Sequence, residues 1–135
     1  MALISWDQNI ILNVEEMDIE HKQLFVLVNN LRQAMVSPVG KIGVNRALKE
    51  LVEFTREHFA TEERLMTAHG YPNYEQHKRE HEALLQDVDQ LLQRYHDGDA
   101  LIPFAIELDL EAWAYKHIDG CDRDLAVYLN EQGVF

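Results

Sequence analysis

Cysteine is nearly absent from this chain, in which Cys121 is the only one among 135 residues. A single cysteine cannot form an internal disulfide, and alone it cannot build an iron–sulfur cluster or a multi-cysteine zinc site. Basic residues are also scarce, since 12 lysines and arginines stand against 24 aspartates and glutamates and leave a net charge of −12. This acidity argues against nucleic acid and anionic membranes as partners, because both attract basic surfaces.

Long hydrophobic runs are missing too, and the first residues lead us to expect no signal peptide. No segment approaches the roughly 20 apolar residues that a transmembrane helix needs. The first residues carry no basic side chain and reach an acidic one at Asp7, unlike the start of a signal peptide. We therefore expect a cytoplasmic protein. At 47% apolar residues the chain is still too hydrophobic to be disordered, and its length fits one domain, residues 1–135, with a real core.

Proline is rare, and the three prolines fall at three breaks in the sequence. These breaks lie at 37–43, at 69–73 and at 96–99 with Pro103 shortly after. The segments between them carry apolar residues in steps of three and four, and no strand-like alternation competes. The pattern predicts an all-α fold, an up-down-up-down four-helix bundle with residues 1–16 as an N-terminal arm.

Histidine is what the chain does have, with seven residues. His69 and His96 stand at predicted helix ends, where an imidazole can cap free carbonyls and suits the helix dipole. The other five occupy inward-facing positions on the four predicted helices, where polar side chains are costly unless each finds a partner. A common ligand would explain all of them together. These five are His21, His58, His77, His81 and His117.

Two spacings give this hypothesis its geometry. His77 and His81 are four residues apart, so both imidazoles project from one helix face about one turn apart. His58 and Glu62 have the same spacing and supply a nitrogen and a carboxylate from another helix. Either pair alone is a weak signal, but the coincidence on the inward faces of four helices favours metal binding.

The types of ligand narrow the choice of metal. Five imidazoles with carboxylates are too many for one ion. A structural zinc ion takes four ligands and would favour cysteine, whereas magnesium and calcium prefer oxygen ligands. Nitrogen-rich ligation with bridging carboxylates therefore indicates a pair of iron ions, with manganese as the lesser option.

A second bridging carboxylate should come from the last helix, and spacing does not identify it. Asp119 follows His117 too closely to share its face, while Asp124 returns to that face. Asp122 would need the reach of its carboxylate or a local distortion of the helix to join the site. All three candidates stay open on geometry alone.

Taken together, these residues resemble the hemerythrin family, and the match covers nearly the whole chain. It includes Trp6-Asp7, the run Asp18-Ile19-Glu20-His21-Lys22, the run Glu62-Glu63-Arg64-Leu65-Met66, and Tyr71-Pro72. Within the family, the likeness is to stand-alone bacteriohemerythrins. The motifs that carry it are His21, His58-Phe59-Ala60-Thr61-Glu62, His77-Lys78-Arg79-Glu80-His81 and His117-Ile118-Asp119-Gly120-Cys121-Asp122.

The resemblance implies a complete ligand set and selects Asp122. One iron would be held by His77, His81 and His117, and the other by His21 and His58. Glu62 and Asp122 would bridge the two ions together with an oxo or hydroxo group. Two octahedral irons offer about 12 positions, and this set fills all but one. The open position lies on the iron with two histidines, where the family binds dioxygen.

The resemblance also implies an apolar pocket around bound dioxygen. Ala114 stands where the family commonly has leucine, which predicts a wider path to the open iron. Cys121 stands where the family often has threonine and is expected to be a small buried thiol. The pocket residues are expected to be Phe25, Phe59, Trp113, Ala114 and Ile118.

The function implied is reversible dioxygen binding for storage, transport or delivery, without enzymatic activity. One alternative is an oxygen or redox sensor. Another is a diiron enzyme that reduces peroxide or nitric oxide. No residue pattern points to a protein recipient of the oxygen.

Overall fold

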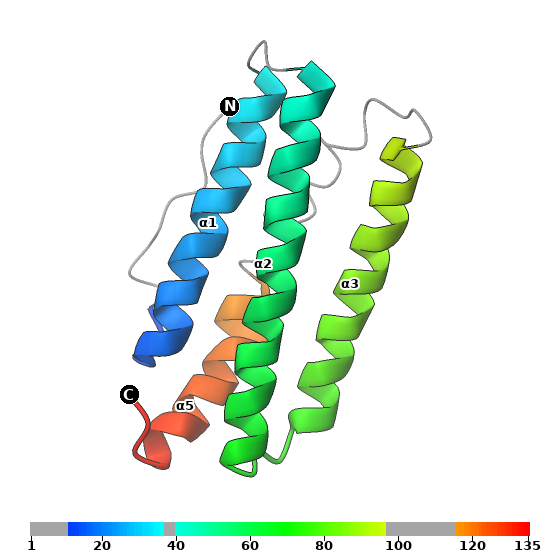
Figure 1. Ribbon diagram of the computed structural model, residues 1–135. Helices are drawn as coiled ribbons and strands as arrows, with labels where there is room; N and C mark the ends of the chain where they lie inside the picture. Colours follow the sequence, from blue (N-terminus) through cyan, green and yellow to red (C-terminus); the bar gives the residue numbers. More distant parts are fainter. Residues whose placement is uncertain (1–10, 37–39, 97–115) are drawn as a thin grey trace.

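Four helical columns make up the part of the chain that the computed structural model describes, residues 11–36, 40–96 and 116–135. The first three are α1 (Glu15–Val36), α2 (Gly40–Ala68) and α3 (Tyr74–His96). The last begins with a π-helical turn, η2 (Ile118–Asp122), and continues as α5 (Arg123–Glu131). Neighbouring columns run in opposite directions (Figure 1), which confirms the predicted up-down-up-down bundle. None of the helices described is both long and apolar enough to cross a membrane.

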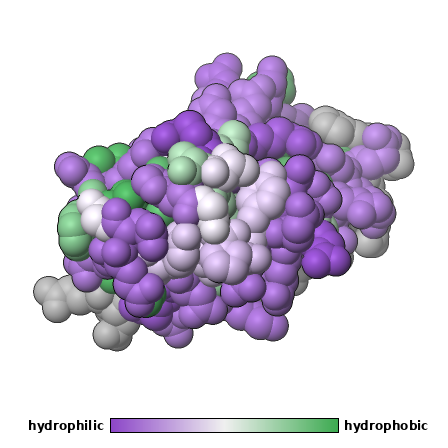
Figure 2. Space-filling model, turned by 90° about the horizontal axis from the view of Figure 1, so that it is seen from below, coloured by the Kyte–Doolittle hydropathy of each residue, from purple (hydrophilic) through white to green (hydrophobic). Residues whose placement is uncertain are grey.

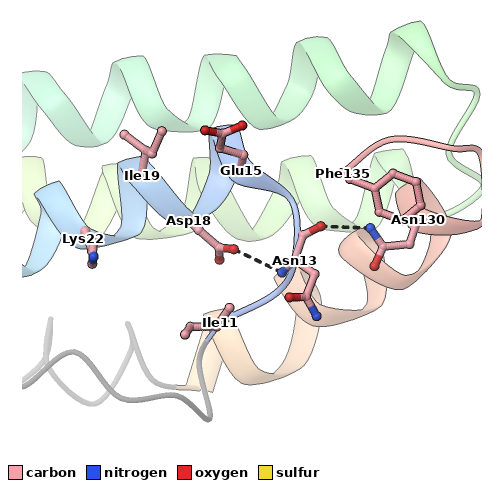
Figure 3. A pocket seen from close by; sticks show the side chains of 8 residues that line it. All are labelled: Ile11, Asn13, Glu15, Asp18, Ile19, Lys22, Asn130 and Phe135. Atoms are coloured by element: carbon pink, nitrogen blue, oxygen red, sulfur yellow. Dashed lines mark hydrogen bonds between the residues drawn. The ribbon is translucent and has the colours of Figure 1, made fainter.

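Helix α1 begins two residues earlier than the sequence predicts. The N-terminal arm was expected to extend to residue 16, but α1 starts at Glu15 because Asp18 caps the preceding segment. Its carboxylate accepts hydrogen bonds from the backbone N–H groups of Leu12 at 2.9 Å and Asn13 at 3.1 Å. The Asn130 amide in turn donates to the Asn13 carbonyl at 3.0 Å and ties this segment to α5 (Figure 3).

The core follows the predicted apolar faces. On α1 and α2 the side chains of Met17, Leu24, Leu48 and Leu51 are buried at the predicted three- and four-residue spacing. The N-terminal segment adds Leu12 and Val14, which are also buried. Viewed from the end of the bundle where α1 begins, the surface is mostly hydrophilic (Figure 2), as the excess of acidic residues predicts.

The end of α2 is tied to α5 through its backbone carbonyls. Gly70 adopts a positive φ of 63°, and the Tyr71 N–H donates to the Met66 carbonyl at 2.9 Å, which closes the helix in a Schellman-type turn. From α5, the Tyr128 hydroxyl donates to the His69 carbonyl at 2.6 Å. The backbone of His69 is therefore part of this helix end, the position that sequence spacing assigned to it.

Replacing Tyr128 with phenylalanine tests this link. The variant should lose the hydrogen bond to the end of α2 and keep the ring packing, so the free energy of unfolding should fall by about 1 kcal/mol. Denaturant unfolding followed by circular dichroism measures this difference. An unchanged midpoint would show that the hydroxyl does not hold α5 against α2.

Candidate metal centre

Seven polar side chains converge at one depth inside the bundle. None is more than 4% exposed, although carboxylate side chains are mostly exposed in proteins and histidines are only intermediate in burial. They come from every helical column: one from α1, two each from α2 and α3, and two from the last column. They are His21, His58, Glu62, His77, His81, His117 and Asp122.

Glu62 lies at the centre of this cluster. Its Oε2 atom is 2.8 Å from His58 Nε2 and 3.3 Å from His21 Nε2. Its Oε1 atom is 3.0 Å from the Nε2 atoms of both His77 and His81, and 3.9 Å from that of His117. One carboxylate oxygen therefore faces two imidazoles, and the other faces three.

Asp122 repeats this division from the opposite column. Its Oδ2 atom lies 3.0 Å from His21 Nε2. Its Oδ1 atom lies 3.0 Å from His77 Nε2 and 2.9 Å from His117 Nε2. Among the described residues neither oxygen has a partner with hydrogen-bond geometry, although both are buried. Buried acceptor oxygens that lack a hydrogen-bond donor and converge with imidazole nitrogens are suited to bind a cation.

The π-helical turn explains how Asp122 reaches the site. In η2 the Arg123 N–H bonds to the Ile118 carbonyl five residues earlier, instead of the four of an α-helix. The wider turn brings Asp122 round to the face of His117. Asp119 and Asp124, the two other candidates, are exposed. The structure therefore brings together all seven residues that the resemblance selected.

The ligand atoms form two groups that share both carboxylates. The three-histidine group comprises His77, His81 and His117 with Glu62 and Asp122. The two-histidine group comprises His21 and His58 with the same two carboxylates. Within each group, one candidate ligand atom per residue lies within 4.8 Å of all the others. This is the arrangement expected for two neighbouring cation positions bridged by Glu62 and Asp122.

The buried carboxylates and imidazoles of the cluster shift one another's pKa values. Burial would raise the pKa of Glu62, but the surrounding imidazoles, His58 first, hold it well below the ordinary value. Burial would likewise lower the pKa of His58, but the nearby carboxylates of Glu62 and Glu20 outweigh burial and raise this pKa to about 10. The pKa of His77 is raised to about 9, because the carboxylates Asp122 and Glu62 again outweigh burial. Without a cation, protons on the imidazoles therefore balance the two carboxylates.

Three further carboxylates stand behind the imidazoles, and sequence reasoning missed them. Glu20 of α1 lies 2.7 Å from His58 Nδ1. Glu63 of α2 lies 3.4 Å from His81 Nδ1, and Glu80 of α3 lies 3.9 Å from His117 Nδ1. Each is next in sequence to a predicted ligand but contacts an imidazole of the following helix. An acidic neighbour beside an inward ligand was the available signal.

The expected pocket residues are only partly described. Phe25, Phe59 and Ile118 are buried as predicted, while Trp113 and Ala114 lie outside the described residues. The Phe59 ring stacks on that of His81, with centroids 3.8 Å apart and planes within 3°. Phe59 therefore shields the three-histidine group. A role for these side chains around dioxygen stays a prediction.

Cys121 is half-buried rather than fully buried. Its thiol contacts the Glu80 carboxylate, which also faces His117. It therefore stands beside the centre and outside the two groups of ligand atoms.

Fold and site together define a class: a four-helix bundle that binds metal cations in its interior through histidine and carboxylate ligands. A family model described as the hemerythrin HHE cation binding domain matches residues 12–129. The chain belongs to the hemerythrin family, as its motifs predict.

Named relatives and solved structures agree with this assignment. The chain is 32% identical over 126 residues to a bacteriohemerythrin of Stenotrophomonas maltophilia, covering 93% of this chain and 81% of that protein. It is 28% identical to a bacteriohemerythrin of Methylococcus capsulatus, covering 91% and 94%. A crystal structure of a hemerythrin variant with a leucine-to-tyrosine substitution superposes with a TM-score of 0.87 at 28% identity, covering 96% of this chain and 98% of that one.

Proposed function

We propose that this protein binds dioxygen reversibly at two iron ions, one in each group of ligand atoms. The observation that carries the proposal is the division of Glu62 and Asp122, each of which turns one oxygen to either group. Carboxylates shared in this way suit two cations a few ångströms apart. The mixture of imidazole and carboxylate ligands suits iron better than magnesium, calcium or a cysteine-bound zinc.

The two halves of the site differ in a way that suits a small ligand. Two ferrous ions would supply the electrons that dioxygen takes up on binding. His21 and His58 provide two imidazoles where the other half has three. The two-histidine half is thus the one with fewer protein ligands, and we place the dioxygen position there. The buried side chains Phe25, Phe59 and Ile118 support the proposal by keeping water away from the cluster.

Carriage rather than catalysis fits the residues around the ligands. Release of unchanged dioxygen requires no positioned acid or base, and both buried carboxylates of the cluster lie against imidazoles at the ligand positions. The proposed role is therefore storage, transport or delivery of dioxygen.

Anaerobic reduction of the iron-loaded protein followed by exposure to oxygen tests this function. We expect a visible charge-transfer band that appears with oxygen, fades under vacuum or argon, and returns over several cycles. Protein stripped of metal with a chelator is the control and should show no band. Immediate irreversible oxidation on first exposure would contradict carriage and favour a sensor or an enzyme acting on peroxide or nitric oxide.

A further inference from the structure

The contact between Glu20 and His58 is the tightest of the carboxylate contacts behind the imidazoles. Glu20 Oε1 lies 2.7 Å from His58 Nδ1, and on the other side of the same ring His58 Nε2 faces Glu62 Oε2 at 2.8 Å. A carboxylate can only accept, so Nδ1 carries the proton and donates it. In the neutral imidazole the Nε2 lone pair is then directed into the cluster, as metal ligation requires.

Glu20 is itself held in place by α2. The Thr61 hydroxyl donates to Glu20 Oε2 at 2.9 Å, a shorter distance than the 3.2 Å to the Glu57 carbonyl on its own helix. Both oxygens of Glu20 are therefore directed by α2 side chains, one by His58 and one by Thr61. His58 and Thr61 are three residues apart on the same face of α2, so one Glu20 carboxylate can accept hydrogen bonds from both.

The corresponding contacts in the three-histidine group are looser. Glu63 lies 3.4 Å from His81 Nδ1, and Glu80 lies 3.9 Å from His117 Nδ1. The Glu80 side chain is 43% exposed, whereas that of Glu20 is 22% exposed. A hydrogen bond to a charged acceptor is stronger when it is short and shielded from water. Among the described residues, the shortest of these three contacts is therefore the one to His58, in the group with fewer imidazoles.

We propose that Glu20, held by Thr61, is a positioning residue that sets how tightly the two-histidine group keeps its metal ion. The inference rests on the proposed function only in that an iron ion occupies this group. With two imidazoles instead of three, the orientation of His58 controls a larger share of the binding. The carboxylate fixes the tautomer and the ring plane, and it also makes Nε2 more basic.

Release of ferrous iron tests the proposal on the full-length, iron-loaded protein. The protein is reduced anaerobically and mixed with ferrozine, and the coloured iron(II) complex is followed with time. In Glu20→Ala we expect half of the iron to leave about 10- to 100-fold faster than in wild type, with the other half changed less than about twofold. Thr61→Val should accelerate the same half by a smaller factor. Glu20→Gln keeps an acceptor oxygen and should fall between wild type and Glu20→Ala.

A variant on the other half is the matched control. Glu63→Ala removes the carboxylate that faces His81 in the three-histidine group. When it is combined with Glu20→Ala, the half of the iron that Glu20→Ala releases faster should leave at an unchanged rate. Exposed Glu15 on α1 controls for loss of surface charge, and Glu15→Ala should release iron as wild type does. Circular dichroism of each loaded variant confirms that the bundle is intact.

Failure of this inference is distinct from failure of the proposed function. Wild-type protein without two irons per chain, or without a reversible oxygen band, would overturn the proposed function. If wild type passes both tests and Glu20→Ala releases both irons equally fast, or neither faster, the role of Glu20 is wrong and the proposed function stands.

Discussion

Replacing Glu62 with glutamine is expected to empty the metal centre. Both oxygens of Glu62 are engaged, one with each group of imidazoles, so a single change weakens both ion positions at once. Loss of one supporting residue behind a ligand weakens metal binding about 10- to 100-fold, and loss of a shared ligand should exceed that range. For the proposed diiron centre, metal analysis of the purified protein should fall from two irons per chain in wild type to below about half an iron in the variant.

Two controls make this result specific. Glu57 lies on the same helix and is exposed, so Glu57→Gln changes the same chemistry away from the site and should retain both ions. On the last column, Asp122→Asn should lose metal, whereas Asp124→Asn, at an exposed carboxylate, should keep it. Two irons retained in Glu62→Gln would refute the bridging arrangement.

Removing the metal should lower the melting temperature by about 10–20 °C. Ligand binding at about a thousandfold excess over its dissociation constant adds about 4 kcal/mol to stability, and for a domain of this size each kcal/mol shifts the midpoint by roughly 3–5 °C. Without cations, seven buried polar groups must satisfy one another, which is a poor substitute for ligation. Calorimetry of loaded and chelator-stripped protein measures the difference.

The difference in melting temperature between the metal-loaded and stripped forms should widen as pH rises from 6 to 9. In the stripped form the pKa values of His58 and His77 are raised to about 10 and about 9. The two protonated imidazoles therefore contribute fully to folding stability below the ordinary histidine pKa, and this contribution is lost as pH rises through the raised values. Metal binding instead displaces those protons and strengthens with pH. The low pKa of Glu62 acts in the opposite range, since its contribution is lost in acid. A gap that narrows toward pH 9 would contradict this coupling.

Helical periodicity was sufficient to predict the bundle and most of the cluster. The apolar spacing on α1, α2 and α3 is regular, and the inward faces of these helices also carry His21, His58, Glu62, His77 and His81. Their burial follows from geometry that an ideal helix preserves. The start of α1 was harder to predict, because it depends on the Asp18 carboxylate accepting from backbone groups that the apolar pattern does not register.

Helical periodicity did not predict that Asp122 and the supporting carboxylates belong to the site. An ideal helix directs Asp122 away from His117, and only the family resemblance selected it. Glu20 contacts His58, which is 38 positions away in the sequence, and no periodicity connects the two. Such contacts are set by how neighbouring helices face one another, which a single sequence does not encode locally. The roles of Trp113 and Ala114 remain predictions.

The π-helical turn gives the three ligand pairs a common rule. His58 with Glu62, and His77 with His81, are each separated by one turn of the α-helix that carries them. His117 and Asp122 are separated by one turn of a wider helix. The two ligands of each pair are therefore one helical turn apart, although that turn contains four residues in α2 and α3 and five in η2. The π-helical turn accommodates one additional residue within a single turn. Deleting one residue between His117 and Asp122 should therefore convert η2 into a regular α-helical turn, which would keep the pair on one face and leave α5 in register.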